Sequence, residues 1–418
     1  MQVFKFGGAS VKDAPAIRNL LQILQRYDGE ELVVVISAMG KTTNFLEGVL
    51  RAYSQQEDTS ALVEDLMRYH LDILRELLPD DEEGVARLLA LRDGLTRKLA
   101  EPYSGRYDYE YDQVVSFGEL MSTTLISHFL QCSGIGNTWL NACELVMTDT
   151  TYREGRVNWQ RTGERIRQAV PALLGQHQVV ITQGFIGGTT AQTRVTLGRE
   201  GSDYTAAIFA YCLDAERVTI WKDVPGLLNA DPKRFPDAVK LDEIPYQEAL
   251  ELSYYGASVI HPKTLKPLQN KHIPLHVKSF FHPEDAGSMI GDCVLSTKIP
   301  SFIVKDNQTL LTIFPKDFSF VAEENLSEIF SLFAKYRVRI NMMQNSALSF
   351  SVCTGTDLER VKECVEEMQT RYKVKYNEHV TLVTVRHYTP ESIRRVTEGR
   401  TILLRQTSRT TIQYVLLS

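Results

Sequence analysis

The sequence predicts an α/β protein in which a large region built on a mainly parallel sheet is followed by a smaller α/β region. The first observation is that short apolar runs rich in β-branched residues alternate with helical patterns. Apolar strands that alternate with helices are typical of a parallel sheet buried on both faces. The second observation is a change of texture near Lys298, after which the elements are shorter and follow the ferredoxin-like order βαββαβ.

The strands expected in the first region are its best apolar runs. These are Val3–Phe6, Leu32–Ile36, Val179–Thr182 and Val218–Trp221. Helices are predicted where apolar residues recur every three or four positions, as they do from Leu62 to Leu77. Residues 48–106 are expected to be mostly helical, and the acidic stretch Asp80–Glu83 is interpreted as a solvated turn before a helix, with a metal site as the alternative.

The elements expected after Lys298 form two small modules. The first, over about residues 309–377, comprises strands Thr309–Phe314, Val338–Met342, Leu348–Val352 and Val374–Tyr376 and helices Glu323–Tyr336 and Leu358–Tyr372, with a turn at Gln344–Ser346. The second, over residues 380–418, comprises strands Thr381–Val385, Ile402–Leu404 and Thr411–Leu416 and helix Pro390–Val396. It lacks a last helix and strand, and the upstream strand Phe302–Val304, within residues 300–306, can complete its sheet. We therefore expect one domain over residues 1–297 and two interleaved modules over residues 298–418.

Composition predicts a cytoplasmic protein and excludes several classes of partner. At about 150 residues per domain, the 418 residues suggest two or three domains. The net charge is −6 and no basic run occurs, so no nucleic acid partner is expected. Six scattered cysteines without a C-x-x-C pair indicate reduced thiols rather than disulfides or a zinc site. We expect no signal peptide and no membrane span, because the N-terminus runs into a charged strand and no apolar stretch is long enough.

The N-terminal motif KFGGASV, residues Lys5–Val11, lies between a predicted strand and a predicted helix. A glycine-rich turn at a helix N-terminus directs backbone N–H groups at an anion, and Lys5 adds a positive charge. The motif is neither a Walker A loop nor a dinucleotide fingerprint. It therefore predicts a phosphate cradle, with a plain glycine turn beside a surface lysine as the alternative. Small residues also follow two other strands, at Ser37–Gly40 and Gly184–Gly188, and ligands bind at such strand ends in open α/β sheets.

Two further motifs combine charges with glycine turns. In Leu197–Ala207 a polar turn leads into an apolar helix, so that Asp203 is either an N-cap or a functional carboxylate beside Arg199. We favour the functional interpretation because capping alone does not explain the arginine. In Trp221–Arg234 a strand is followed by a Pro-Gly turn and a cluster of aspartates and bases, which suits the base and ribose of a nucleotide. A charged surface loop is the alternative.

Two single residues carry less information. Glu119 begins an apolar helix, where a glutamate is common as a partner of the helix dipole. His261 precedes a proline and has no nucleophile at a catalytic spacing, so we interpret it as structural.

Taken together, the motifs resemble those of aspartate kinase in the amino-acid-kinase family. The matching stretches, in family order, are KFGGASV, SAMGKTTNFL, SFGELMS, QGFIGG, TLGREGSDYTA, WKDVPG with ADPK, and YYGASVIHP. The tail resembles the paired ACT domains of that kinase. The resemblance implies a three-layer kinase domain that uses MgATP to phosphorylate the side-chain carboxylate of L-aspartate, the first step toward lysine, threonine and methionine. It also implies a homodimer formed through the ACT domains.

The resemblance also implies roles for individual residues. Lys5 and Asp203 are expected to be catalytic, and the expected ATP contacts are Lys5, Gly7, Gly8, Ser10, Ser37, Trp221, Lys222, Asp223, Asp231 and Lys233. The expected aspartate contacts are Thr43, Glu119, Phe185, Arg199 and Ser202, and an amino-acid effector is expected at Asn341, Asn345 and Ser346. Mg²⁺ is expected to be held mainly by ATP, without a protein ligand.

The sequence departs from the family pattern at several positions. These are Asn141 and Cys143 in place of aspartate and arginine, Leu228 in place of tyrosine, Ser258 in place of lysine, and Ala347 and Leu348 in place of serine and glutamate. The last change removes a charge that a lysine effector would use, so feedback by lysine is not expected to be strong. Two other functions stay open: a kinase of the same family acting on another acid, and a non-catalytic amino-acid sensor.

Overall fold

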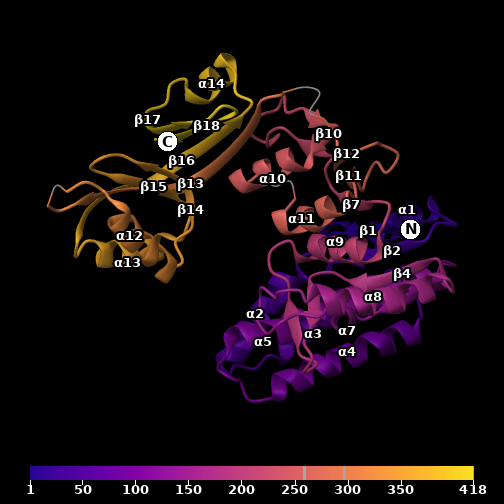
Figure 1. The fold of residues 1–418 in the computed structure, drawn as a ribbon. Coiled ribbons are helices and arrows are strands. Elements are labelled where there is room, and N and C mark those ends of the chain that lie inside the picture. Colours follow the sequence, from indigo (N-terminus) through magenta and orange to yellow (C-terminus); the bar gives the residue numbers. More distant parts are fainter. Residues whose placement is uncertain (258–259, 295–297, 318, 418) are drawn as a thin grey trace. The chain divides into compact units, whose positions relative to one another are not determined.

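The computed structural model describes residues 1–257, 260–294, 298–317 and 319–417. The chain divides into two compact units (Figure 1). The first unit contains Met1–Leu227, Lys240–Leu250 and Val259–Leu295. The second contains Ser296–Ser418 together with two earlier segments, Leu228–Val239 and Glu251–Ser258. Two stretches that lie early in the sequence therefore belong with the C-terminal part of the chain.

The first unit is built on an eight-stranded sheet. Its order is β10 (Glu243–Pro245), β12 (Ser288–Gly291), β11 (Leu275–Ser279), β7 (Val218–Lys222), β1 (Gln2–Phe6), β2 (Leu32–Ile36), β4 (Val179–Gln183) and β3 (Asn137–Leu140). All neighbouring pairs are parallel except β11 with β12. The predicted, mainly parallel sheet is confirmed, and the four strands expected from the sequence are its central members.

Helices cover both faces of this sheet. They are η1 (Gly8–Val11), α1 (Ala14–Gln25), α2 (Thr42–Ser54), α3 (Ser60–Leu77), α4 (Glu82–Ala100), α5 (Tyr107–Val115), α6 (Phe117–Cys132), α7 (Ala142–Leu145), α8 (Trp159–Leu174), α9 (Gly201–Leu213), α10 (Tyr246–Tyr255) and α11 (Pro262–Asn270). Every residue of β1, β2 and β4 is buried, which requires cover on both faces. The three-layer α/β arrangement is therefore confirmed. Short strands β5 (Ile186–Gly188) and β6 (Arg194–Thr196) pair as a hairpin, and β8 (Leu227–Leu228) pairs with β9 (Lys240–Leu241).

The second unit contains a six-stranded sheet whose neighbouring strands are antiparallel. Its order is β14 (Ile340–Asn345), β15 (Phe350–Thr354), β13 (Ser301–Pro315), β16 (Tyr372–Arg386), β18 (Thr411–Leu416) and β17 (Ile402–Thr407). Its helices are α12 (Glu323–Lys335), α13 (Leu358–Met368) and α14 (Pro390–Thr397). Figure 1 shows β13 and β16 as the long central strands of this sheet.

Each long strand serves two ferredoxin-like modules. The C-terminal half of β13 pairs with β15 and with the N-terminal half of β16 in the first module. The N-terminal half of β13 pairs with the C-terminal half of β16, which in turn pairs with β18, in the second module. The interleaved arrangement expected from the sequence is thus confirmed.

Three details of the expectation are wrong. The separate strands predicted on either side of residue 306 are one strand, β13, because a shift of register near Gln308 lets the chain continue through a polar stretch. The strands predicted on either side of residue 379 are likewise one strand, β16. The predicted turn at Gln344–Ser346 also lies too early. β14 continues to Asn345, opposite Phe350, and the turn is closed by Ser346, whose backbone N–H donates to the carbonyl oxygen of Ser349.

Within the part of the chain that the structure describes, no helix is both long enough and apolar enough to cross a membrane.

Candidate active site

The carboxyl ends of three neighbouring strands form the floor of the candidate site. The N–H of Ser37 donates to the carbonyl oxygen of Phe6 at 3.1 Å, and the N–H of Gly184 donates to that of Ile36 at 2.9 Å. The segments that leave β1, β2 and β4 are therefore held side by side. Helix α9 contacts β1 and β2, so its N-terminal residues belong to the same region.

The turn after β1 has no room for a side chain at Gly8. A Cβ atom there would lie 2.8 Å from the carbonyl oxygen of Ala38. The carbonyl oxygen of Gly8 also accepts a hydrogen bond from the N–H of Gly40 at 3.0 Å. Main chain therefore packs directly against main chain where β1 and β2 end.

A buried carboxylate lies between two lysines at this edge. Asp203 Oδ1 is 2.7 Å from Lys5 Nζ, and Asp203 Oδ2 is 3.8 Å from Lys222 Nζ. Burial alone would raise the pKa of Asp203, but the charges of Lys5 and Lys222 outweigh burial and hold that pKa below its usual value. Asp203 is therefore ionised, and it fixes Lys5 at the end of β1. The cluster brings together residues that lie far apart in the sequence.

Glu119 lies in the first turn of α6 and is also buried. One carboxylate oxygen, Oε1, accepts the N–H of Ala38 at 3.3 Å, while Oε2 has no hydrogen-bond partner among the described residues. Burial raises the pKa of Glu119 to about 8, against the smaller opposing effects of the Ala38 N–H and the Lys5 charge. A buried carboxylate with an unpartnered oxygen can accept a cation from a ligand.

The turn before α9 brings other predicted residues together. Gly198 (φ 79°) and Glu200 (φ 54°) are both left-handed, and the exposed Arg199 lies between them. A Cβ on Gly184 would lie 2.5 Å from Cβ of Ser202, so Ser202 packs directly on the end of β4. Phe185 follows with φ 68°, and its main-chain oxygen accepts the N–H of Leu197 at 2.8 Å.

The remaining predicted residues of the first unit are less informative. Thr43 is half-buried in the first turn of α2, and Gly7 precedes η1. Ser10 is buried, and its hydroxyl donates to the main-chain oxygen of Trp221 at 3.4 Å. The Trp221 ring is fully buried and stacks on Phe6. Asp223 is exposed.

Asp231 and Lys233 belong to the second unit, whereas Lys5 belongs to the first. Both are exposed. Asp231 Oδ1 accepts the N–H of Lys233 at 2.9 Å, and its main-chain oxygen accepts the N–H groups of Arg234 and Phe235. Asp231 therefore shapes a turn of the segment Leu228–Val239.

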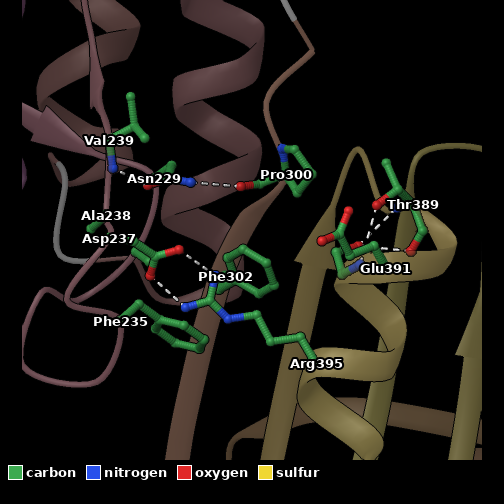
Figure 2. Close-up of a pocket in the computed structure, with 12 residues that line it drawn as sticks. Asn229, Phe235, Asp237, Ala238, Val239, Pro300, Phe302, Thr389, Glu391 and Arg395 are labelled. Carbon is green, nitrogen blue, oxygen red and sulfur yellow. Dashed lines mark hydrogen bonds and ion pairs between the residues drawn. The ribbon is translucent and has the colours of Figure 1, made fainter.

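That segment lies against α14 and the start of β13, around a cavity of about 200 Å³ (Figure 2). The Arg395 guanidinium donates to Asp237 and lies over the rings of Phe235 and Phe302, at 4.8 Å and 5.4 Å from their centroids. The two rings stack on each other at 4.8 Å. Asn229 is held by the main chain of Pro300 and Val239. The segment is therefore clamped by charge and aromatic contacts within the second unit.

The predicted effector residues lie on β14 and its turn. The Asn341 side chain is engaged on both sides, by Lys305 Nζ at 2.9 Å and by the Gln308 side chain at 2.7 Å. Asn345 is exposed at the end of β14. The Ser346 hydroxyl lies 2.8 Å from the Ser349 hydroxyl. The exposed Leu348 of the same turn carries no charge.

The departures from the family pattern have partial explanations. Asn141 is the N-cap of α7, where its side-chain oxygen accepts the N–H of Cys143 at 3.2 Å. Burial raises the pKa of the Cys143 thiol to about 12, which disfavours its thiolate form. Leu228 is half-buried, and nothing in the structure explains its replacement of tyrosine. Ser258 lies outside the described residues.

Sequence reasoning missed Asp112. Its carboxylate accepts the N–H of Thr196 at 2.9 Å, the Thr196 hydroxyl at 2.7 Å and the N–H of Arg153 at 2.9 Å. Asp112 thereby fixes the strand that leads into the Arg199 turn. Its sequence neighbourhood gives no signal, because Thr196 lies 84 residues away. His261 is the N-cap of α11, in keeping with its interpretation as structural.

Among residues 1–257, 260–294, 298–317 and 319–417, no group of three or more histidine, cysteine, aspartate or glutamate side chains is arranged to hold a metal ion.

The paired Lys5 and Asp203 and the close main-chain packing at Gly8 form the candidate site at the strand ends of this α/β unit. The chain belongs to the amino acid kinase family, whose model matches residues 1–279.

The relatives agree with this assignment. The chain is 31% identical over 396 residues to lysine-sensitive aspartokinase 3 of Escherichia coli, covering 92% of this chain and 86% of that protein. It is 29% identical to the Arabidopsis thaliana bifunctional aspartokinase/homoserine dehydrogenase 2, but spans only 42% of that protein's length. The solved structure of E. coli aspartokinase III with aspartate and ADP superposes with a TM-score of 0.84 at 26% identity, covering 100% of this chain and 96% of that one. The same enzyme with lysine and aspartate gives 0.83, covering 99% and 95%.

Proposed function

We propose that the protein is an aspartate kinase, which transfers the terminal phosphoryl group of ATP to the side-chain carboxylate of L-aspartate and forms 4-phospho-L-aspartate and ADP. The observation that carries this proposal is the Lys5–Asp203–Lys222 cluster at the strand ends of an amino acid kinase fold. The likeness to E. coli aspartokinase III supports it, since that enzyme has been solved with aspartate and ADP. The reaction is the first step toward lysine, threonine and methionine.

The residues of the cradle fit a polyphosphate. We assign Gly7, Gly8 and Ser10 to the turn that holds the phosphate, and Ser37 to the neighbouring strand end. Lys5, fixed by Asp203, faces the phosphoryl group and neutralises charge as it redistributes, which is the main demand of phosphoryl transfer. Lys222 supplies a second positive charge beside Asp203. Trp221, Asp223, Asp231 and Lys233 complete the proposed nucleotide contacts. Mg²⁺, carried by the nucleotide, supplies further charge neutralisation, and we assign it no protein ligand.

We assign the acceptor, aspartate, to a second subsite. Arg199 pairs with a carboxylate of aspartate through its planar guanidinium, and Glu119 accepts the ammonium through its unpartnered oxygen. Bringing an ammonium to Glu119 favours its ionised form, so binding itself prepares the contact. Thr43, Phe185 and Ser202 line the same subsite. This division gives the enzyme one subsite for each reactant.

A coupled assay of ADP release tests the proposal against its alternatives. We expect ADP formation with aspartate, and little with glutamate or N-acetylglutamate measured side by side. A preference for another acid would make the protein a different kinase of the family. An absence of ADP release with every acid, by protein that still binds amino acids, would make it a sensor.

We also propose that residues 298–418 are a tandem ACT region and residues 1–297 the kinase domain, in a cytoplasmic homodimer formed through the ACT modules. The proposed boundary at residue 297 lies outside the described residues. The support is the pair of ferredoxin-like modules, which end in exposed edge strands that can pair between chains. Light scattering of the full chain should give a mass near twice 47.4 kDa. A monomer at micromolar concentration would contradict it.

An amino-acid effector is proposed at Asn341, Asn345 and Ser346. Because Ala347 and Leu348 offer no charge to a lysine side chain, we expect millimolar lysine to inhibit weakly or not at all. Losing one charged contact costs about 1.5–3 kcal/mol, or roughly ten- to a hundredfold in affinity. Strong inhibition by lysine at tens of micromolar in the ADP assay would show that other residues supply the charge.

A further inference from the structure

Glu200 is a left-handed residue in the middle of the turn that carries the proposed acceptor contacts. Its φ of 54° is costly for a residue with a side chain, and glycine would adopt it freely. It is also the N-cap of α9, yet its side chain makes no capping hydrogen bond to that helix. The carboxylate is therefore engaged in something other than the usual local role of an N-cap.

The Glu200 carboxylate reaches a second helix. Its Oε2 accepts the main-chain N–H of His261 at 2.9 Å. His261 is the N-cap of α11, and its own Nδ1 accepts the N–H of Lys263 at 3.2 Å. A negative charge at a helix N-terminus is favourable because the helix dipole is positive there. The Glu200 charge is thus satisfied at α11, and Arg199 has no ion pair or hydrogen bond among the described residues.

The same two helices are tied at their other ends. Asp214, the C-cap of α9, is likewise left-handed with φ 50°, and it forms an ion pair with Lys271, the C-cap of α11. Glu200 and Asp214 therefore share one arrangement: each is a left-handed residue at an end of α9 whose carboxylate contacts α11. They differ in that only Glu200 adjoins Arg199 and Ser202.

We infer that Glu200 is a positioning residue of the acceptor subsite: its hydrogen bond to the His261 main chain fixes the left-handed turn that presents Arg199 and Ser202 to a carboxylate-bearing acceptor. The inference rests on the proposed function, because it assigns Glu200 to that reaction. Glu200 acts through its neighbours and does not touch the reacting atoms. Its backbone strain is held by a contact that lies 61 residues away in the sequence.

Three substitutions separate the carboxylate from the backbone conformation. Glu200→Gly relieves the strain and removes the contact, Glu200→Ala keeps the strain and removes the contact, and Glu200→Gln keeps an oxygen that can accept the N–H. We expect Glu200→Gly to raise KM for aspartate roughly tenfold, since a hydrogen bond to a charged group is lost, with KM for ATP nearly unchanged. Glu200→Ala should be worse, and Glu200→Gln should stay close to the original protein.

Asp214→Gly is the matched control, because it removes the equivalent carboxylate at the far end of α9. It should leave KM for aspartate unchanged. Hydrogen exchange measured by mass spectrometry gives a readout independent of activity: Glu200→Gly should speed exchange of the peptide around His261 and Asp214→Gly should not. The inference is overturned if Glu200→Gly keeps the original KM, or if Glu200→Gln is as defective as Glu200→Ala. Either result leaves aspartate-dependent ADP release by the unsubstituted protein intact, so it differs from failure of the proposed function.

Discussion

The charged residues at the end of β1 and those of the segment Leu228–Val239 are both proposed to hold the nucleotide, but they differ in burial. Lys5 and Asp203 are buried and paired at 2.7 Å, while Asp231 and Lys233 are exposed. A buried charge is stable only when it is paired or hydrogen-bonded, whereas an exposed charge is hydrated at little cost. Lys5 and Asp203 are therefore held in position before a ligand binds. The positions of Asp231 and Lys233 instead depend on the conformation of the segment Leu228–Val239.

This difference in burial predicts different effects of substitution in the two sets. Substitutions among the buried, mutually fixed charges should change the chemical step. Substitutions that loosen the exposed segment should change only how well the nucleotide is held.

The strongest test of the buried set is Lys5→Ala. We expect kcat to fall about a hundredfold or more, about 2.7 kcal/mol, with a smaller change in KM, because the lysine charge matters most as phosphate charge redistributes. Steady-state ADP release measures both constants. Lys266→Ala, an exposed lysine on α11, should have no effect. Near-normal turnover of Lys5→Ala would remove this residue from the chemistry.

The proposed acceptor subsite combines the buried Glu119 with the exposed Arg199, and Glu119→Ala and Arg199→Ala test it. Each should raise KM for aspartate roughly ten- to a hundredfold, since a charged hydrogen bond contributes about 1.5–3 kcal/mol. ATP affinity, measured by calorimetry on the same variants, should be nearly unchanged and serves as the internal control. If either variant loses ATP binding instead, the division into two subsites is wrong.

The raised pKa of Glu119 predicts a pH dependence. The pKa of Glu119 is raised to about 8, so Glu119 is mainly protonated in the free protein when the pH is below this value. The ammonium group of aspartate pairs only with the ionised carboxylate. Binding must then release a proton, so kcat/KM for aspartate should rise about tenfold per pH unit up to this pKa and level off above it. The profile from pH 6 to 9 measures it, and Glu119→Gln should lose this rise. An unchanged profile in Glu119→Gln would assign the titration to another group.

The smallest effect is expected from the clamp on the exposed segment. Arg395→Ala removes the pair with Asp237 and the contacts with Phe235 and Phe302. Because exposed ion pairs are weak, we expect KM for ATP to rise by only about threefold, with KM for aspartate unchanged. Arg394→Ala, on the exposed side of the same helix, is the control. A loss of turnover as large as that of Lys5→Ala would contradict the expectation that the exposed segment affects only nucleotide binding.

The sequence predicts the parts of this molecule that local patterns determine. The central strands follow from runs of neighbouring residues, and the fold class follows from their alternation with helices. Contacts between distant residues leave no such pattern. The sequence near Glu200 does not indicate that its carboxylate contacts His261. The sequence near Asp112 likewise does not indicate that its carboxylate contacts Thr196.

The local sequence also does not predict that β13 is one continuous strand. Lys305–Thr309 is a polar stretch that ends a strand in any local reading, and Asn307 adopts φ 52° there. Pairing with β16 on one side carries the strand across this interruption. The assignment of individual residues to ATP, aspartate or an effector stays a prediction, because it comes from resemblance and no ligand contact tests it.

The sharing of β13 and β16 makes the two modules inseparable. A chain cut between them would leave each without a strand that its sheet requires, so neither can be exchanged, lost or unfolded alone. Each long strand also has one half in each module. A shift of register or a change of twist in one half is therefore transmitted to the other half through continuous main chain. A ligand bound at one end of this sheet is therefore linked to the other end by continuous strands, and this link requires no rigid-body movement of a domain.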